Sequence, residues 1–85
     1  MIGKAYKNPY FSYFLPVSRY SNGFEGVLVT RLHTSYTIMN NGVVYLGETS
    51  SFEEIPMSEF LEEFKKATEY MIKEVEVTYD AGNDL

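Results

Sequence analysis

The chain has no cysteine, no tryptophan and a single histidine among its 85 residues. Without cysteine it can form neither a disulfide nor a thiolate metal site. It also lacks any apolar run near the ~18 residues that a membrane-spanning helix needs, so no membrane contact is expected. The first residues carry charge but no following apolar stretch, so a secretory signal is not expected either. These absences predict a cytoplasmic protein.

The two halves of the sequence carry opposite charge: acidic residues are scarce in the first half and basic residues in the second. Residues 1–47 hold four basic residues against one acidic residue, whereas residues 48–85 hold eleven acidic residues against three basic ones. The net charge of the chain is −5. Non-specific duplex binding needs a broad positive field, which the whole molecule lacks. We therefore expect any nucleic-acid contact to use the first half alone.

Apolar and aromatic residues are well represented, at 45% and 16% of the chain. Such a composition is typical of a folded globular protein rather than of a disordered segment. A chain of this length can bury one small core. We expect a single domain over residues 1–85.

Residues 3–48 are predicted to form successive antiparallel strands. Stretches rich in aromatic and β-branched residues, such as YFSYFLPVSRY and FEGVLVTRLHT, alternate with turn residues. Pro16 inside the first of these suggests a sheet edge or a bulge. The pairs Asn22-Gly23 and Asn41-Gly42 predict tight turns, and the second pair predicts a hairpin between SYTIM and VVYLGE. This pattern favours a curved antiparallel sheet of four or five strands, forming a half-barrel.

One amphipathic helix is predicted over residues 57–74. Apolar residues recur at helical spacing from Met57 to Val75 and form one stripe, opposite a side rich in glutamate and lysine. Residues 75–79, VEVTY, alternate instead, so both a last strand and a helix end stay open there. Residues 80–85 are predicted to be a frayed tail. The predicted fold class is therefore α+β, with one C-terminal helix capping the sheet.

Several stretches together resemble small proteins of phages and other bacterial mobile elements. They are GKAYK, YFSYF, the two Asn-Gly pairs, and FEEIPMSEF leading into an acidic helix. The resemblance covers most of the chain and rests on structural motifs, although Pro56 stands where a serine or threonine N-cap is expected. Small acidic phage proteins are often inhibitors of host systems, and some imitate nucleic acid. The resemblance therefore implies binding to a host macromolecule.

Residues suited to catalysis or metal binding are few. His33 is flanked by Leu32 and Thr34, which suggest no converging ligands, so no metal site is predicted. The sequence contains no nucleophile elbow and no phosphate-binding loop. Glu62 and Glu63 are adjacent on the predicted helix and do not face one another as an acid–base pair would. We expect a protein that is not an enzyme and needs no cofactor.

The first binding hypothesis concerns the acidic side of the helix. Glu59, Glu63, Tyr70 and Glu74 lie within about 60° of each other on a helical wheel, away from the predicted core. Tyr70 would anchor a partner protein, and the carboxylates would steer a basic surface, such as that of a nucleic-acid-binding host protein. The alternative is that the carboxylates are only solvated and that Tyr70 lies over the stem of Lys66 or against the sheet edge.

Two further hypotheses concern the strands. Aromatic residues interleaved with cations could stack unpaired bases, and the candidates are Lys4, Lys7, Tyr13, Arg19 and Arg31. The alternative is that these rings form the core, and the acidic helix would also repel phosphates. Finally, strands that are apolar on both faces, with an edge carrying Pro16, would suit a homodimer.

Overall fold

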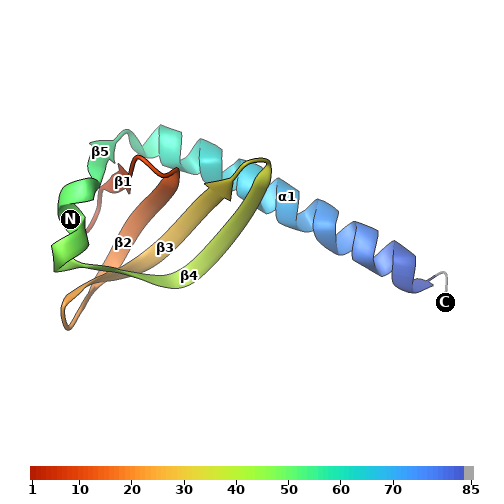
Figure 1. Cartoon of the computed structure of the whole chain (residues 1–85), viewed down its shortest axis with the longest axis horizontal. Helices are drawn as coiled ribbons and strands as arrows, with labels where there is room; N and C mark the ends of the chain where they lie inside the picture. Colours follow the sequence, from red (N-terminus) through yellow and green to blue (C-terminus); the bar gives the residue numbers. More distant parts are fainter. Residues whose placement is uncertain (84–85) are drawn as a thin grey trace.

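The computed structural model contains an open five-stranded antiparallel sheet and one C-terminal helix (Figure 1). It describes the backbone of residues 1–83 and the side chains of residues 1–79. The elements are β1 (Ala5–Lys7), β2 (Ser12–Tyr20), β3 (Gly23–Leu32), β4 (Ser35–Tyr45), the 3-10 helix η1 (Leu46–Ser51), β5 (Glu53–Ile55) and α1 (Met57–Asn83). The strand order is β4-β3-β2-β1-β5. The predicted α+β class is therefore confirmed.

The long strands β2, β3 and β4 form a meander with two tight turns. Tyr20 pairs with Gly23, so the first turn consists of Ser21 and Asn22, close to the predicted Asn-Gly position. In the second turn, between Leu32 and Ser35, His33 has a φ of 58°. A left-handed residue fits such a two-residue hairpin turn, and histidine is among the side chains that tolerate it.

The hairpin predicted at Asn41-Gly42 is wrong, because β4 runs unbroken from Ser35 to Tyr45. Gly26 pairs with Gly42 and Leu28 pairs with Met39, so two residues of β4 oppose a single residue of β3. This arrangement is a β-bulge. A Cβ atom on Gly42 would lie only 2.7 Å from the Cβ atom of Leu28. The glycine therefore serves close strand packing at a bulge rather than a turn.

Pro16 lies at a second irregularity, where the register of β2 against β3 shifts between Pro16 and Ser18. The predicted bulge at this proline is thus confirmed, although β2 is an inner strand of the sheet. The pairing of β1 with β2 reaches only as far as Phe14. Along the rest of β2, among the described residues, β3 is the only paired neighbour. A proline is tolerated in such a setting.

After β4 the chain crosses to the opposite edge of the sheet. η1 leads into β5, which pairs with β1 at that edge. α1 begins directly afterwards, where the carbonyl of Pro56 accepts hydrogen bonds from the N–H groups of Glu59 and Phe60. The helix then runs back across one face of the sheet and packs most extensively against β4.

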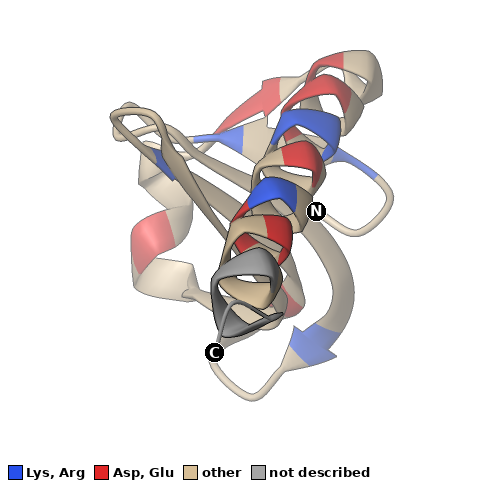
Figure 2. Ribbon diagram, turned by 90° about the vertical axis from the view of Figure 1, so that its right-hand side faces the viewer, with Lys and Arg blue, Asp and Glu red and all other residues tan. Residues whose placement is uncertain are grey.

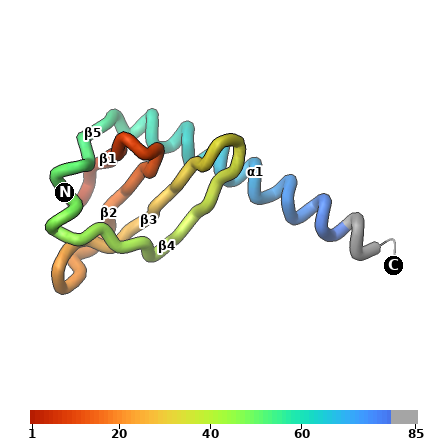
Figure 3. The backbone as a smooth tube through the Cα atoms, viewed as in Figure 1, coloured from red at the N-terminus to blue at the C-terminus, as the bar shows by residue number. Residues whose placement is uncertain are grey.

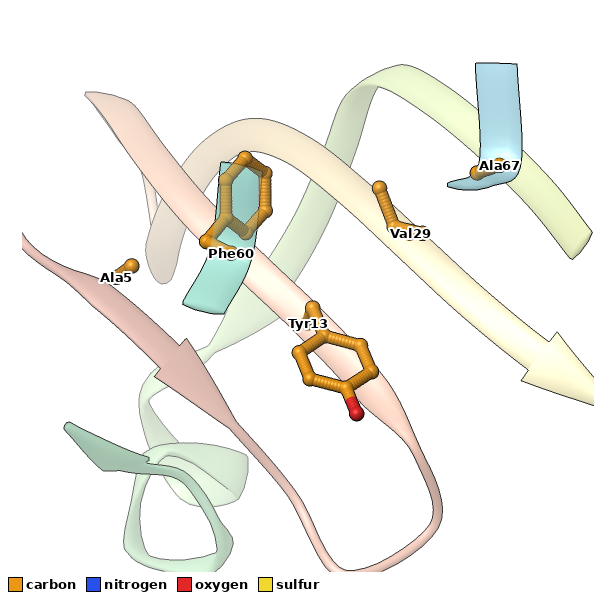
Figure 4. Packing of buried hydrophobic residues seen from close by; sticks show 5 residues of the cluster. All are labelled: Ala5, Tyr13, Val29, Phe60 and Ala67. Carbon is orange, nitrogen blue, oxygen red and sulfur yellow. The ribbon is translucent and has the colours of Figure 1, made fainter. Parts of the chain in front are cut away.

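Buried apolar residues lie on both faces of the sheet because neighbouring strand residues point in opposite directions. The cluster between the sheet and α1 consists of Ala5, Tyr13, Val29, Phe60 and Ala67 (Figure 4). The cluster on the other face consists of Phe14, Phe24 and Val44, with Met1, Leu28 and Phe52 packed against it. Each face of the sheet thus carries its own cluster of buried apolar residues.

α1 is longer than predicted. Residues 75–79 are helical rather than extended, and the helix continues to Asn83, so its predicted end at residue 74 is wrong. Of the predicted tail, residues 80–83 belong to α1, while residues 84–85 lie outside the described residues. The C-terminal half of the helix projects beyond the sheet (Figures 1 and 3). The long axis of the molecule consequently measures 48 Å, against 25 and 20 Å for the other two.

Candidate functional site

Glu63 is buried, with an exposed fraction of 7%. The hydroxyl of Tyr36 on β4 donates to Glu63 Oε2 at 3.3 Å, and Lys66 Nζ lies 3.5 Å from Glu63 Oε1. The prediction that Glu63 faces solvent is therefore wrong. Its side of the helix is turned toward the edge strand, which supplies a polar partner for the carboxylate.

Tyr70 also packs against β4 and is half-buried. Its ring centroid lies 6.1 Å from that of Tyr36, and its hydroxyl donates to Ser35 Oγ at 3.2 Å. Of the interpretations of Tyr70 that the sequence left open, contact with the sheet edge is the one observed. The phenol is therefore engaged within the protein rather than presented to a partner.

The other two residues of the predicted acidic surface lie apart from each other. Glu59 is partly covered and lies 3.9 Å from Lys7 on β1, whereas Glu74 is exposed on the projecting part of α1. Lysines and glutamates alternate along the described part of the helix (Figure 2). The four predicted residues thus do not form one open acidic surface.

Tyr13, the aromatic candidate for base stacking, belongs to the core and is only 3% exposed. Burial, reinforced by the negative charge of Glu63, raises the pKa of Tyr13 above its ordinary value of 10.0. A ring enclosed in this way offers no face on which a base could stack.

Of the four cations of the same hypothesis, Lys7 lies over the Tyr13 ring, with its Nζ 5.8 Å from the ring centroid. Lys4 lies 3.4 Å from Glu54 and Lys7 lies near Glu59, so both lysines have acidic neighbours. Arg19 stacks over Phe24, which lies near the start of β3, and Arg31 stacks over Phe11 from the other end of β3. The structure therefore does not gather these cations into one groove.

Sequence reasoning missed a surface formed by apolar residues of the projecting part of α1. Met71, Ile72, Val75 and Tyr79 are 42%, 52%, 65% and 67% exposed. They continue the stripe that Phe60, Phe64 and Ala67 bury against the sheet. We call these four residues the apolar stripe of α1. The first three were expected in the core, because helical spacing shows which residues share a face but not where the sheet beneath them ends.

A comparison of lengths could have revealed this surface. A helix over the predicted residues 57–74 is about 27 Å long. Five strands spaced by roughly 4.8 Å form a sheet only roughly 20–24 Å wide. A helix that crosses such a sheet and keeps its apolar stripe must therefore expose the end of that stripe.

A shallow apolar groove joins the stripe to the sheet edge. It lies between β4 and α1 and is lined by Ile38, Asn40, Phe64, Thr68, Met71, Ile72, Val75 and Glu76. Further along α1, a second shallow depression is lined by Met71, Glu74, Val75, Thr78 and Tyr79. Both depressions are lined mainly by apolar side chains, and each also has one glutamate in its lining.

Comparison with protein-family models, with curated proteins and with solved structures finds no match for this chain. Among the described residues, no group of three or more histidine, aspartate or glutamate side chains is arranged to hold a metal ion. Within residues 1–83, no helix combines the length and the apolar character required to cross a membrane.

Proposed function

We propose that this chain is a small binding protein that acts through protein–protein contact rather than catalysis. Its contact surface is the apolar stripe on the projecting half of α1. The observation that carries the proposal is the position of Met71, Ile72, Val75 and Tyr79, which are exposed together on one side of a helix that extends beyond its own sheet. Contiguous apolar side chains on a surface are typical of interaction sites, whereas scattered ones are ordinary.

The energetics of the stripe support this assignment. Burying a large apolar side chain contributes about 1.5–3 kcal/mol relative to leaving it in water, and each member of the stripe realises only part of that gain. Tyr79 adds an aromatic ring with a polar hydroxyl, a combination that is frequent at protein interfaces. Contact with a partner would recover free energy that folding alone leaves unused.

The acidic surface is a weaker basis for binding. A basic partner would find Glu63 and Tyr70 engaged with β4 and Glu59 beside Lys7. Single-stranded nucleic acid is likewise disfavoured by the burial of Tyr13 and by the dispersed cations. The apolar stripe is the surface that requires no rearrangement before contact.

Site-specific photo-crosslinking in the cells that naturally produce the protein tests this function. A photo-reactive residue replaces Val75 in one variant and Val77 in the other. Val77 is a matched control, because it is 68% exposed but lies on the opposite side of the same helix. We expect a crosslinked protein product from position 75 and none from position 77. Absence of a product at position 75, or equal products at both positions, would refute the proposed contact surface.

A further inference from the structure

β4 is an open sheet edge that has a bulge but no proline and no charged residue. Its 11 residues are SYTIMNNGVVY, and the bulge lies at Asn40 and Asn41. By contrast, β5 at the opposite edge has three residues, two of them Glu53 and Glu54. Proteins guard free edges with short strands, charge and proline, because an unguarded edge pairs with other chains. The composition of β4 therefore suits an edge that a partner strand covers.

The half of β2 that does not pair with β1 is also protected against pairing with another chain. It carries Pro16, the bulge that follows it, and Arg19. The other free edges of the sheet thus carry charged residues, whereas β4 has its bulge alone. This contrast within one sheet singles out β4 as the site of pairing.

The open edge and the apolar stripe lie side by side. α1 crosses β4 where Tyr70 contacts Ser35 and Tyr36, and it then extends past the sheet (Figures 1 and 3). Ile38 of β4 lines the same groove as Met71, Ile72 and Val75. A partner that adds a strand to β4 would therefore also meet the stripe.

We propose that this partner is a second copy of the chain, an inference that rests on the proposed function of the stripe. The two β4 strands pair antiparallel about a twofold axis perpendicular to the sheet, giving one continuous sheet across both copies. Both α1 helices then lie on the same face, and each projecting half reaches over the seam toward the partner copy. The stripe of each copy is covered in the same contact that closes the open edge.

The absence of charged residues from β4 is compatible with a second copy at this strand. Each chain carries a net charge of −5, which would disfavour self-association through a charged surface. β4 contributes no charge to the seam, so pairing two copies sets no like charges directly opposite each other along the strands. β4 itself offers no carboxylate to a basic partner, whereas Glu74 and Glu76 of α1 line the neighbouring depressions.

The available area is also sufficient. The exposed parts of Met39, Met71, Ile72, Val75 and Tyr79 amount to an area on the order of 500 Å² per copy, since large side chains bury 150–250 Å² each. The edge of β4 and the residues flanking the stripe add to this area. Stable interfaces bury about 800 Å² per partner, and a contact that includes both elements approaches that size.

Sedimentation equilibrium of the purified full-length chain tests the inference. We expect the wild-type chain to be a dimer. Val75→Lys should weaken self-association at least roughly tenfold, because each copy loses an apolar contact and gains a charge at the interface. Val77→Lys introduces the same charge on the opposite side of α1 and should leave self-association unchanged. Circular dichroism checks that both variants fold.

A second pair of variants tests the strand seam separately from the helix. Met39→Lys places a cation on β4 of each copy, within the shared seam, and should weaken the dimer by a similar factor. Val17→Lys is the control, because Val17 is 61% exposed on the guarded strand β2. The proposed arrangement would be overturned if, in either pair of variants, the control weakened the dimer as much as the test substitution. It would also be overturned if Met39→Lys did not weaken the dimer.

The outcomes distinguish this inference from the proposed function. A wild-type chain that stays monomeric at its highest soluble concentration would overturn the pairing of copies. If position 75 nevertheless crosslinks to a different protein in cells, the stripe remains a contact surface with another partner. If the chain is monomeric and position 75 crosslinks to nothing, both proposals fail. A dimer whose product at position 75 is the chain joined to itself supports both.

Discussion

Glu63 joins α1 to β4 through one hydrogen bond and one ion pair. Tyr36 donates to one carboxylate oxygen, and Lys66 lies near the other. Removing an almost buried carboxylate leaves the Tyr36 hydroxyl without this acceptor, and an unsatisfied buried polar group costs free energy. The neighbouring Glu62 has a side chain that is 68% exposed, and its distance from Lys66 is 3.9 Å. Exposed pairs of that kind contribute little to stability.

We therefore predict that Glu63→Ala lowers the free energy of unfolding by about 1–2 kcal/mol. Glu62→Ala should change it by less than about 0.5 kcal/mol. Both substitutions introduce the same residue into the same turn of helix, so intrinsic helix propensity cancels between them. Urea unfolding followed by circular dichroism measures both values. Equal effects would show that the contact between Glu63 and β4 contributes nothing to stability.

The positions of Glu63 and Tyr70 mark the limit of prediction at the residue scale. Helical spacing correctly places them on the same side of α1, because that relation depends on the sequence alone. It does not show that β4 lies beneath that side, since the direction of the edge strand depends on how the whole sheet is assembled. A glutamate and a tyrosine that find hydroxyl partners on a neighbouring strand cannot be told from solvated ones by their spacing.

At the scale of elements, the bulge in β4 shows how one dipeptide serves different structures. Asn41-Gly42 would suit a hairpin turn, yet the chain continues through it as a strand with one extra residue. Leu28 on β3 occupies the space that a side chain at position 42 would need. Gly47 in η1 has open surroundings, because a Cβ atom added there would have no neighbouring atom within 4 Å. The two glycines therefore differ in the reason for their presence.

This difference gives a prediction for two glycine substitutions. Gly42→Ala should lower the free energy of unfolding by about 1–3 kcal/mol, because Leu28 or the strand backbone must shift to admit the methyl group. Gly47→Ala should be neutral or slightly stabilising, because it reduces only the freedom of the unfolded chain. Thermal unfolding of the two variants checks the prediction. An equal loss of stability in both would contradict the close packing of Gly42 on Leu28.

The C-terminal half of α1 shows why the alternation in VEVTY misled the prediction. Residues 75–79 fit a strand pattern, but a strand needs a neighbour with which to form its hydrogen bonds. Once a helix has formed over the preceding residues, each residue added to its end gains one backbone hydrogen bond. The Thr78 hydroxyl also donates to the carbonyl of Glu74, one turn earlier. Local propagation therefore outweighs β-propensity here.

At the scale of the whole molecule, the meander of β2, β3 and β4 follows from short connections between successive strands. The placement of β5 beside β1 does not, because the crossover through η1 is not marked by any periodic pattern. Because of that crossover, β4 lies at one edge of the sheet and α1 begins at the other edge, beside β5. The open edge and the projecting helix, the two features on which the proposed contact depends, are consequences of this topology.

Amide hydrogen exchange over residues 71–79 of the purified chain tests the central claim, that a second copy of the chain covers the projecting half of α1, most directly. A helix end without tertiary contacts opens readily, so its amides exchange fast unless a partner covers them. We predict slower exchange in the wild-type chain and in Val77→Lys than in Val75→Lys, whose apolar stripe is interrupted. Equally fast exchange in all three proteins would mean that nothing covers the stripe under these conditions and would contradict the claim.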